Sequence, residues 1–408
     1  MGSTSEKTDS PPCAKLPTTA TVAALEEALL QVSREMGAEP DRLDVDLTQC
    51  DYVEPAALVY FLSVLAARRG KRLETRLCLP RSKDVRDFLR VWNFPAAVRH
   101  VAGQSFSALV PPEDLQFFGE NPTPATMKYA GRLLDEGVER LVSDKFFALM
   151  TFLPEQIRSR TRLVVNESAR WEEKLVRSVL ATHLNGPDGY VASRIVFESM
   201  MNAVRHPRAR HIVTTSKFDA PGECQADSKG HLTLIYWDDG TSMFTTLMEA
   251  IIAGKEVRST TVPELSAGYQ LTIVDENGVR QPPSLVNSDL VPNRSMPRPV
   301  VLLSTLFPGV TCDVTGTGHE VHEELRRARP EYALPGMGLA ALVNAVVDVF
   351  SGNLAVRTLD FFMSVKKAYK KDKGAKYRAK IALFDPKIGN FLGNMLTIRL
   401  PLRDKAPL

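Results

Sequence analysis

Cysteine is scarce in this chain of 408 residues, and the few cysteines lie far apart. They are Cys13, Cys50, Cys78, Cys224 and Cys312, and no two of them form a CxxC pair. An odd, scattered set argues against a disulfide framework and against a zinc knuckle. We therefore expect reduced thiols and a cytoplasmic protein.

The sequence also lacks a signal peptide, a membrane-spanning run and a strong excess of one charge. Its first residues, MGSTSEKTDSPPC, are polar and do not match a secretory signal. The most apolar run, LAALVNAVVDVF, is interrupted by Asn344 and Asp348, so we expect no membrane span. The 51 basic and 48 acidic side chains leave a formal charge of +3. That balance excludes a surface that coats nucleic acid as a whole, but not a local basic site.

The chain contains enough apolar sequence for two or three domains. It is 44% hydrophobic and 24% charged, which is ordinary for a globular protein, and it is longer than one core normally serves. Residues 1–17 are predicted to be a disordered tail. Alternating helix and strand patterns predict a small α/β domain at 18–105. A helical connector at 106–164, with a helix near 125–150, precedes a second domain at 165–403.

The first domain carries a short turn at the head of a helix. The strand LDVDLTQC and the turn DYVEPAAL resemble a STAS-like domain, the module of anti-sigma antagonists and sulfate transporters. Signalling members of that family have a phosphorylatable serine at the head of this helix. Here the stretch is Glu54-Pro55-Ala56-Ala57, which has no hydroxyl group, so phosphorylation is not expected there. A packing module without chemistry of its own is the alternative.

Three polar side chains share one face of a mostly apolar helix in the second domain. In VFESMMNAVRH, Glu198, Asn202 and His206 recur every four residues, which places them on one helix face. Two predicted strands, ARHIVTTSKF and HLTLIYWDDG, follow, and the second ends at Asp238 in a turn that contains Gly240. Each pattern alone is common on solvated helices and in turns. Their order along the chain is what makes them informative.

A glycine-rich turn, LPGMGL, then opens a helix at Gly336, Gly338 and Leu339. In this order the motifs resemble the GHKL superfamily of gyrase-type, chaperone, histidine-kinase and mismatch-repair ATPases. ESMMNAVRH matches the N box, DDGTS the first glycine box, PGMGLAALV the second, and GNMLTIRLPL the last strand. The resemblance implies a Bergerat fold, an α/β sandwich whose helices cover a mixed sheet, with a long lid insertion at 241–334. Ser242 departs from the family, because it stands where a second glycine is usual.

The resemblance implies a site for ATP and Mg²⁺, and the residue types suit it. Asn202 offers Mg²⁺ a neutral oxygen, and Glu198, one turn earlier, suits a catalytic base. Asp238 would accept the exocyclic N–H of adenine, and Gly240 would let the backbone approach the base. Phosphates would lie at the N-terminus of the later helix, beside Gly336, Gly338, Leu339 and His206.

Two other patterns favour different chemistry. GMGLAA fits the G-x-G-x-x-A dinucleotide fingerprint, with Asp360 about 20 residues later, although no clear strand precedes it. In the predicted lid, His319, His322 and Glu323 can share a helix face, one residue short of the HExxH metal signature. A polar lid helix is the simpler interpretation of that second pattern.

A basic stretch at 365–380, VKKAYKKDKGAKYRAK, predicts a hairpin with its tip at Gly374. Its cations suit nucleic acid or an acidic protein, and Tyr369 and Tyr377 are candidates to stack on bases. A solvated basic loop is the alternative. The candidate contacts are Lys366, Lys367, Lys370, Lys371, Lys373, Lys376 and Arg378.

Together these patterns predict a Mg²⁺-ATP-driven conformational switch that hydrolyses ATP with Glu198 as base. An anti-sigma-type Ser/Thr protein kinase acting on a separate protein would use the same residues, and a non-catalytic nucleotide-sensing scaffold is a third alternative. The expected partners are ATP, a protein that contacts the STAS-like domain or the lid, and nucleic acid at the hairpin. A homodimer is compatible with the sequence, and no membrane partner is expected.

Overall fold

The computed structural model describes residues 11–37, 39–118, 146–152, 195, 209–219, 230–258, 266–311, 338–370, 372, 374–384 and 391–402. The chain divides into two compact units. One comprises Met1–Lys128 with Lys387–Gly389, and the other comprises Tyr129–Pro386 with Asn390–Leu408. Both combine helices with β-sheet, which confirms the α/β class that the alternating patterns predicted.

The first unit is built on short parallel strands. They are β1 (Cys13–Lys15), β2 (Thr19–Ala20), β3 (Arg42–Asp46), β4 (Tyr52–Val53) and β5 (Glu74–Cys78). One sheet has the order β1-β3-β5, a second pairs β2 with β4, and every pairing is parallel. Leu43 and Val45 of β3 are buried, while the residues that alternate with them are only half-buried. The strand therefore turns one face to the core, as its alternating sequence predicts.

Helices make up the rest of the first unit. Among the described residues they are α1 (Val22–Met36), α2 (Pro55–Gly70), α3 (Lys83–Val91), α4 (Phe94–Ala102), α5 (Phe106–Leu109) and α6 (Pro112–Phe118). Thr21 caps α1 by accepting a hydrogen bond from Ala24 N at 3.1 Å, and Gly37 ends it with a φ of 70°, both common helix signals. Ala56 and Ala57 lie in the first turn of α2 and are each 3% exposed, so the start of this helix is packed inside the unit.

The first unit begins earlier than the predicted domain at 18–105. The prediction of a disordered tail at 1–17 is wrong for residues 13–15, because they form β1 and pair with β3. Ala14 and Leu16 are only 1% and 4% exposed. Two buried apolar side chains and a set of ladder hydrogen bonds fix a segment whose flanking prolines and polar residues suggested a tail.

The first unit also extends further than predicted. α5 and α6 fall in the range that was predicted to be a connector, 106–164, but they pack within this unit. Phe106 and Leu109 of α5 are buried. Asp114 of α6 accepts a hydrogen bond from Leu79 N at 2.9 Å. This part of the chain therefore completes the first unit.

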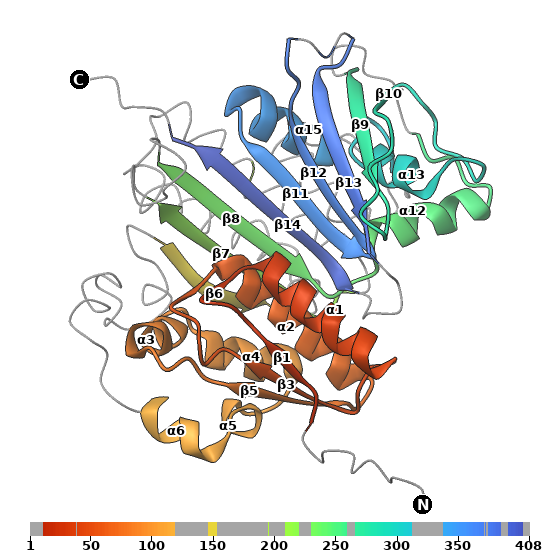
Figure 1. Ribbon diagram of the computed structural model, residues 1–408. Helices are drawn as coiled ribbons and strands as arrows, with labels where there is room; N and C mark the ends of the chain where they lie inside the picture. The colour runs from red at the N-terminus through yellow and green to blue at the C-terminus, as the bar shows by residue number, and fades with distance from the viewer. Residues whose placement is uncertain are drawn as a thin grey trace, which may run out of the picture. The chain divides into compact units, whose positions relative to one another are not determined.

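The second unit contains one nine-stranded sheet (Figure 1). Its strands are β6 (Phe146–Phe152), β7 (Ile212–Asp219), β8 (His231–Asp238), β9 (Gly268–Val274), β10 (Ser284–Asn287), β11 (Asn353–Leu359), β12 (Phe361–Lys367), β13 (Tyr377–Leu383) and β14 (Phe391–Pro401). The order across the sheet is β10-β9-β13-β12-β11-β14-β8-β7-β6. The pairing of β9 with β13 is parallel, and the other seven are antiparallel, so the predicted mixed sheet is present.

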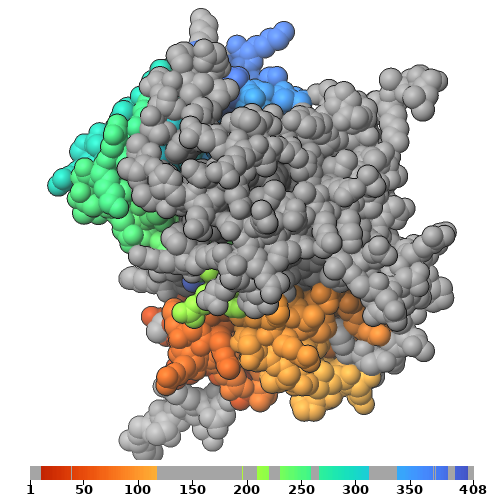
Figure 2. All heavy atoms as spheres, turned by 180° about the vertical axis from the view of Figure 1, so that it is seen from behind, coloured from red at the N-terminus to blue at the C-terminus, as the bar shows by residue number. Residues whose placement is uncertain are grey.

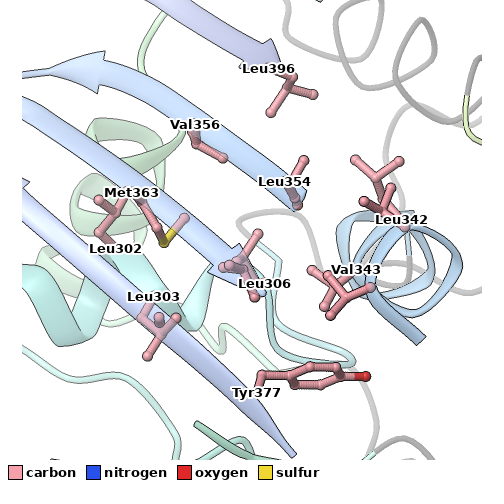
Figure 3. Close-up of a cluster of buried hydrophobic side chains, with 14 of the residues drawn as sticks. Leu302, Leu303, Leu306, Leu342, Val343, Leu354, Val356, Met363, Tyr377 and Leu396 are labelled. Carbon is pink, nitrogen blue, oxygen red and sulfur yellow. The ribbon is translucent and has the colours of Figure 1, made fainter. Parts of the chain in front are cut away.

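Helices pack on one face of this sheet. They are α12 (Met243–Ile252), α13 (Arg298–Ser304) and α15 (Gly338–Val343), which continues as the π-helix η5 (Asn344–Val349). Leu342 and Val343 of α15 are each 1% exposed and belong to the same buried cluster as Leu354 of β11. Figure 3 shows these side chains together with Leu306 and Tyr377, which approach from other parts of the unit. The hydrophobic core of the second unit therefore lies between the mixed sheet and this layer of helices.

Much of the predicted lid belongs to the sheet and its core. The described parts of 241–334 are 241–258 and 266–311, and they form α12, β9, β10 and α13. Tyr269 and Leu271 of β9 are 2% and 1% exposed. The expectation of a lid is therefore wrong for these residues: their apolar side chains are buried against β13 instead of covering a ligand. The remaining residues of 241–334 lie outside the described part of the chain.

Two local predictions about 125–150 and 365–380 had different outcomes. The helix predicted near 125–150 is wrong at its end, where β6 pairs with β7. The basic hairpin is confirmed, because β12 pairs antiparallel with β13 and Gly374 lies between them with a φ of 79°.

In the part of the chain that the structure describes, no helix has the length and hydrophobicity needed to cross a membrane.

Candidate functional site

Asp238 is a buried carboxyl group at the end of β8. Its side chain is 6% exposed. Oδ1 accepts hydrogen bonds from Gly240 N at 3.0 Å and Asn394 Nδ2 at 3.2 Å, whereas the contact of Oδ2 with Asn394 Nδ2 is 3.4 Å long. Within the described residues no cation pairs with this carboxylate. Oδ2 therefore retains most of its capacity to accept a hydrogen bond from a ligand.

Burial raises the pKa of Asp238 from its usual 3.8 to about 7. The hydrogen bonds from Gly240 and Asn394 act in the opposite direction, and the nearby charge of Asp239 raises the pKa slightly further. A buried charge without a counter-ion is costly, and such perturbed groups are concentrated at functional sites. The carboxyl group of Asp238 therefore changes its charge near neutral pH.

Asn394 connects Asp238 to the start of α12. It lies on β14 directly opposite Asp238 and is 3% exposed. Its Nδ2 also donates to Thr241 O at 3.2 Å, while its Oδ1 accepts from Met243 N at 2.8 Å. Thr358 Oγ1 lies 3.0 Å from the same Oδ1. Donors surround the amide oxygen and acceptors surround the amide nitrogen, so one side chain fixes the turn after β8.

Two glycines allow the backbone to close around Asp238. A Cβ at Gly240 would lie 2.9 Å from Asp238 Oδ1 and 3.2 Å from Ala209 Cβ. Gly393 has a φ of 81°, and a Cβ there would overlap the carbonyl oxygen of Asp238. The pairing of β11 with β14 shifts register at this point, as happens at β-bulges beside active sites. Gly240 and Gly393 therefore both allow close packing around Asp238, while the approach of Gly240 to a base stays a prediction.

Ser242 does not need the conformational freedom of a glycine. It has a φ of −54° and is the N-cap of α12. Its Oγ accepts a hydrogen bond from Thr245 N at 3.1 Å. Serine is among the residues that cap helices best. A serine at the position where the resemblance predicts a glycine thus has a local structural reason.

Asp239 follows Asp238 but contacts a different set of partners. Its Oδ1 accepts from Arg210 N at 2.6 Å and His211 N at 2.7 Å, and its Oδ2 lies 2.7 Å from His211 Nδ1. These bonds tie the residues before β7 to the end of β8. Asp239 is therefore a positioning residue, whereas Oδ2 of Asp238 can still accept a hydrogen bond from a ligand.

The structure describes only part of the predicted nucleotide site. Gly338 begins α15, as the glycine-rich turn predicts, and Gly338 and Leu339 are both half-buried. Asp238 and Gly240 form the arrangement described above. The other predicted residues lie outside the described part of the chain; they are Glu198, Asn202, His206 and Gly336, together with His319, His322 and Glu323 of the predicted lid.

Asn394 and Thr358 are the members of the site that sequence reasoning missed. Both are buried polar residues on strands, at 3% and 0% exposure, and nothing in their spacing marks them. Gly393 was the available signal, because an isolated glycine in a strand pattern suggests a bulge or a close backbone approach.

Asp360, the acidic residue of the dinucleotide fingerprint, is engaged elsewhere. Its two carboxylate oxygens accept from Arg298 Nη1 at 3.0 Å and Nη2 at 2.9 Å. The Arg298 guanidinium also lies 4.7 Å from the centroid of the Phe361 ring. This bidentate pair anchors α13 to the turn between β11 and β12, so it accounts for Asp360 without a ribose ligand.

The basic hairpin presents fewer free groups than the sequence suggests. Tyr377 is 4% exposed and donates to Asp348 Oδ2 at 2.6 Å, so the expectation that it stacks on a base is wrong. Lys376 pairs with Asp348 at 2.7 Å and Arg378 with Asp372 at 3.4 Å. Lys366, Lys367 and Lys370 are exposed, and Lys371 and Lys373 lie outside the described residues.

No group of three potential metal ligands occurs among the described residues. A comparison with protein-family models, with curated proteins and with solved structures found no match to this chain.

Proposed function

We propose that this chain binds Mg²⁺-ATP in a Bergerat-type site and acts as a nucleotide-driven conformational switch. The observation that carries the proposal is Asp238, a carboxyl group that is buried at the end of a strand and has no counter-ion among the described residues. A group of this kind lowers stability whenever it is ionised. A ligand that donates a hydrogen bond to it offsets that cost.

Adenine suits the free acceptor of Asp238. The exocyclic amine of adenine is a neutral donor, and among the described residues Oδ2 has only the 3.4 Å contact with Asn394. The ionised carboxylate is the stronger acceptor, so we expect binding to strengthen as the pH rises through the pKa of about 7. Asn394 and Gly240 hold Oδ1, and thereby orient Oδ2.

The phosphate side of the proposed site rests on sequence motifs. Asn202 would ligate Mg²⁺, Glu198 would activate water, and Gly336, Gly338 and His206 would contact phosphates. Of these residues, the structure describes Gly338, where α15 begins. The first backbone N–H groups of a helix have no partner inside the helix, so they are suited to bind phosphate. The Mg²⁺ ion would neutralise phosphate charge, and Asn202 would hold it through a side-chain oxygen.

Hydrogen bonds connect the proposed nucleotide site to the N-terminus of α12. Asp238 and the N-terminus of α12 share Asn394, which bonds to Met243 N at 2.8 Å. A change in hydrogen bonding at Asp238 therefore acts on the start of α12. The first unit, which we propose to be STAS-like, would supply the protein-binding module of the switch. The first turn of its α2 helix contains Ala56 and Ala57 and no hydroxyl group, so this unit would act by contact and not as a phosphate acceptor.

Phosphate release from the full chain with Mg²⁺-ATP separates the proposed switch from its alternatives. We expect slow turnover by the wild type and at least a tenfold loss in Glu198→Ala, because general bases contribute on the order of 10²–10⁴-fold. Glu256→Ala, which removes an exposed carboxylate outside the site, is the matched control and should keep wild-type turnover. Transfer of labelled phosphate to a protein substrate would favour the kinase, and ATP binding without phosphate release would favour the sensor.

The basic hairpin is proposed as a second functional element that binds nucleic acid. The supporting observation is that Lys366 and Lys367 are exposed at the end of β12, next to Tyr369, which is 61% exposed. The Arg378 guanidinium lies 4.6 Å from the centroid of the Tyr369 ring and so supports it from one side. An exposed aromatic ring beside unpaired lysines suits single-stranded nucleic acid.

Replacing Lys366 and Lys367 with glutamine should weaken binding of single-stranded DNA and make it less sensitive to salt. Each lost phosphate contact lowers the slope of log K against log salt by about 0.7. Fluorescence anisotropy at several salt concentrations measures both quantities. Arg69→Gln with Arg280→Gln removes the same charge from two exposed side chains outside the hairpin and should leave the slope unchanged. An unchanged slope in the hairpin variant would contradict this role.

A further inference from the structure

The second unit contains a pocket that the proposed nucleotide site does not use. It has a volume of about 570 Å³ and lies between the end of α12 and the loop that joins β10 to α13. Its lining residues are Ile251, Gly254, Lys255, Glu256, Val257, Arg258, Val291, Pro292, Asn293 and Arg294. Figure 2 shows that residues of this part of the chain, coloured green to cyan, reach the surface. Its volume is typical of sites for small molecules.

The walls of this pocket are fixed by hydrogen bonds. The Arg258 guanidinium donates to Asp289 O at 2.5 Å, to Ser288 O, and to Pro308 O at 3.4 Å. Thr311 N donates to Val257 O at 3.0 Å. On the opposite wall, Asn293 Oδ1 accepts from Ser295 N at 3.0 Å. The pocket is therefore formed before any ligand enters, which reduces the cost of binding.

The charge of the pocket is positive and uncompensated. Lys255, Arg258 and Arg294 oppose the single carboxylate of Glu256, which gives three positive charges against one negative charge. None of the three cations pairs with a carboxylate among the described residues, because the partners of Arg258 are main-chain carbonyl oxygens. By contrast, Arg298, Lys376 and Arg378 of the same unit each have an acidic partner.

Part of this charge has a structural explanation, and part does not. Lys255 follows the C-terminus of α12, where a cation interacts favourably with the helix dipole. Arg258 holds the two walls together. Arg294 has neither role: it is exposed on the loop before α13. An anion in the pocket would account for all three cations.

The floor of the pocket is apolar. Ile251 and Val257 are 7% and 4% exposed, and Pro292 is also buried. Val291 adds an apolar side chain that is 51% exposed. A ligand that uses the whole pocket therefore combines an apolar group with negative charge.

We propose that this pocket binds a small organic anion with two or more negative charges attached to an apolar or aromatic group. It lies at the C-terminal end of α12, whereas Asn394 and the Asp238 site hold the N-terminal end. A helix of ten residues is about 15 Å long. The two sites are therefore separate, and this inference does not depend on ATP binding.

Isothermal titration of the full chain with phenyl phosphate tests the proposal, since this probe joins an aromatic ring to a dianion. Binding should be saturable, and inorganic phosphate should bind at least tenfold more weakly because it lacks the ring. Lys255→Gln with Arg294→Gln should weaken phenyl phosphate at least tenfold. Both side chains are exposed, so the variant should remain folded. Arg69→Gln with Arg280→Gln, which removes two exposed cations that line neither the pocket nor the hairpin, should bind the probe within twofold of the wild type.

The same titration in Asp238→Asn distinguishes this pocket from the proposed nucleotide site. Binding of phenyl phosphate should persist in that variant, because Asp238 does not line the pocket. No binding by the wild type, or a loss in the control variant equal to that in Lys255→Gln with Arg294→Gln, would overturn the proposal. Loss of binding in Asp238→Asn would assign the probe to the other site and would overturn it as well.

Discussion

Replacing Asp238 with asparagine is expected to stabilise the ligand-free protein at pH 8 more than at pH 5. The folded-state pKa is about 7, above the usual 3.8, so the folded protein holds this proton more tightly than the unfolded chain. Stability from this group is therefore full at pH values below about 4, declines as pH rises towards 7, and stays low above it. Asparagine carries no charge and avoids that loss.

The expected size of this effect is large for one side chain. The advantage of Asp238→Asn over the wild type should grow by roughly 2–3 kcal/mol in free energy of unfolding from pH 5 to pH 8. The asparagine oxygen can keep the contacts of Oδ1 with Gly240 and Asn394. Urea denaturation at both pH values, followed by hydrogen exchange on β8, measures the difference within the second unit.

Asp239→Asn is the matched control for that experiment. Asp239 accepts hydrogen bonds from Arg210 N, His211 N and His211 Nδ1, so its replacement removes favourable contacts and should not stabilise the protein at pH 8. If Asp238→Asn also failed to gain stability between pH 5 and pH 8, the carboxyl group would not be the buried, uncompensated charge described here.

Gly393→Ala should disrupt the second unit. The added Cβ would overlap the carbonyl oxygen of Asp238, which belongs to a paired strand and cannot move alone. The φ of 81° adds strain of about 1–2 kcal/mol for any residue with a side chain. Overpacking commonly costs a further 1–3 kcal/mol and sometimes more. Together these effects should accelerate hydrogen exchange in β8 and β14 at least a hundredfold.

Gly278→Ala separates the steric overlap from the backbone strain. Gly278 has nearly the same φ, 79°, and no atom lies within 4 Å of a Cβ placed there. The control variant should therefore be destabilised only by backbone strain. Its hydrogen-exchange rates in β8 and β14 should stay close to those of the wild type. Equal exchange in the two alanine variants would show that β14 does not approach Asp238 as closely as described.

The strands with local patterns were predictable from the sequence, whereas those that depend on distant partners were not. HLTLIYWD and NLAVRTL are apolar enough to indicate β8 and β11, and Gly374 marked the β12–β13 hairpin. GYQLTIV, which forms β9, also contains alternating apolar residues, but it lies within a segment rich in proline, serine and glycine. Its partner is β13, where Tyr377 lies opposite Tyr269. No local rule predicts a parallel pairing between residues so far apart in the sequence.

The candidate site was predictable only where a motif marked it. Asp238 and Gly240 follow from a strand that ends in an acidic turn. Asn394 did not, because an amide within a strand carries no periodic signal, and its importance comes from lying opposite Asp238. Ser242 stands where the resemblance predicts a glycine. It caps α12, and the sequence alone did not indicate that cap.

The most direct test of the account is the affinity of the full chain for Mg²⁺-ATP at pH 8, measured by calorimetry for the wild type and Asp238→Asn. Thermal unfolding at the same pH should show that both are folded. Loss of a hydrogen bond to a charged group costs about 1.5–3 kcal/mol, so we expect Asp238→Asn to bind ATP at least tenfold more weakly. Equal affinity in the two proteins, or no binding by the wild type, would contradict a nucleotide site at Asp238.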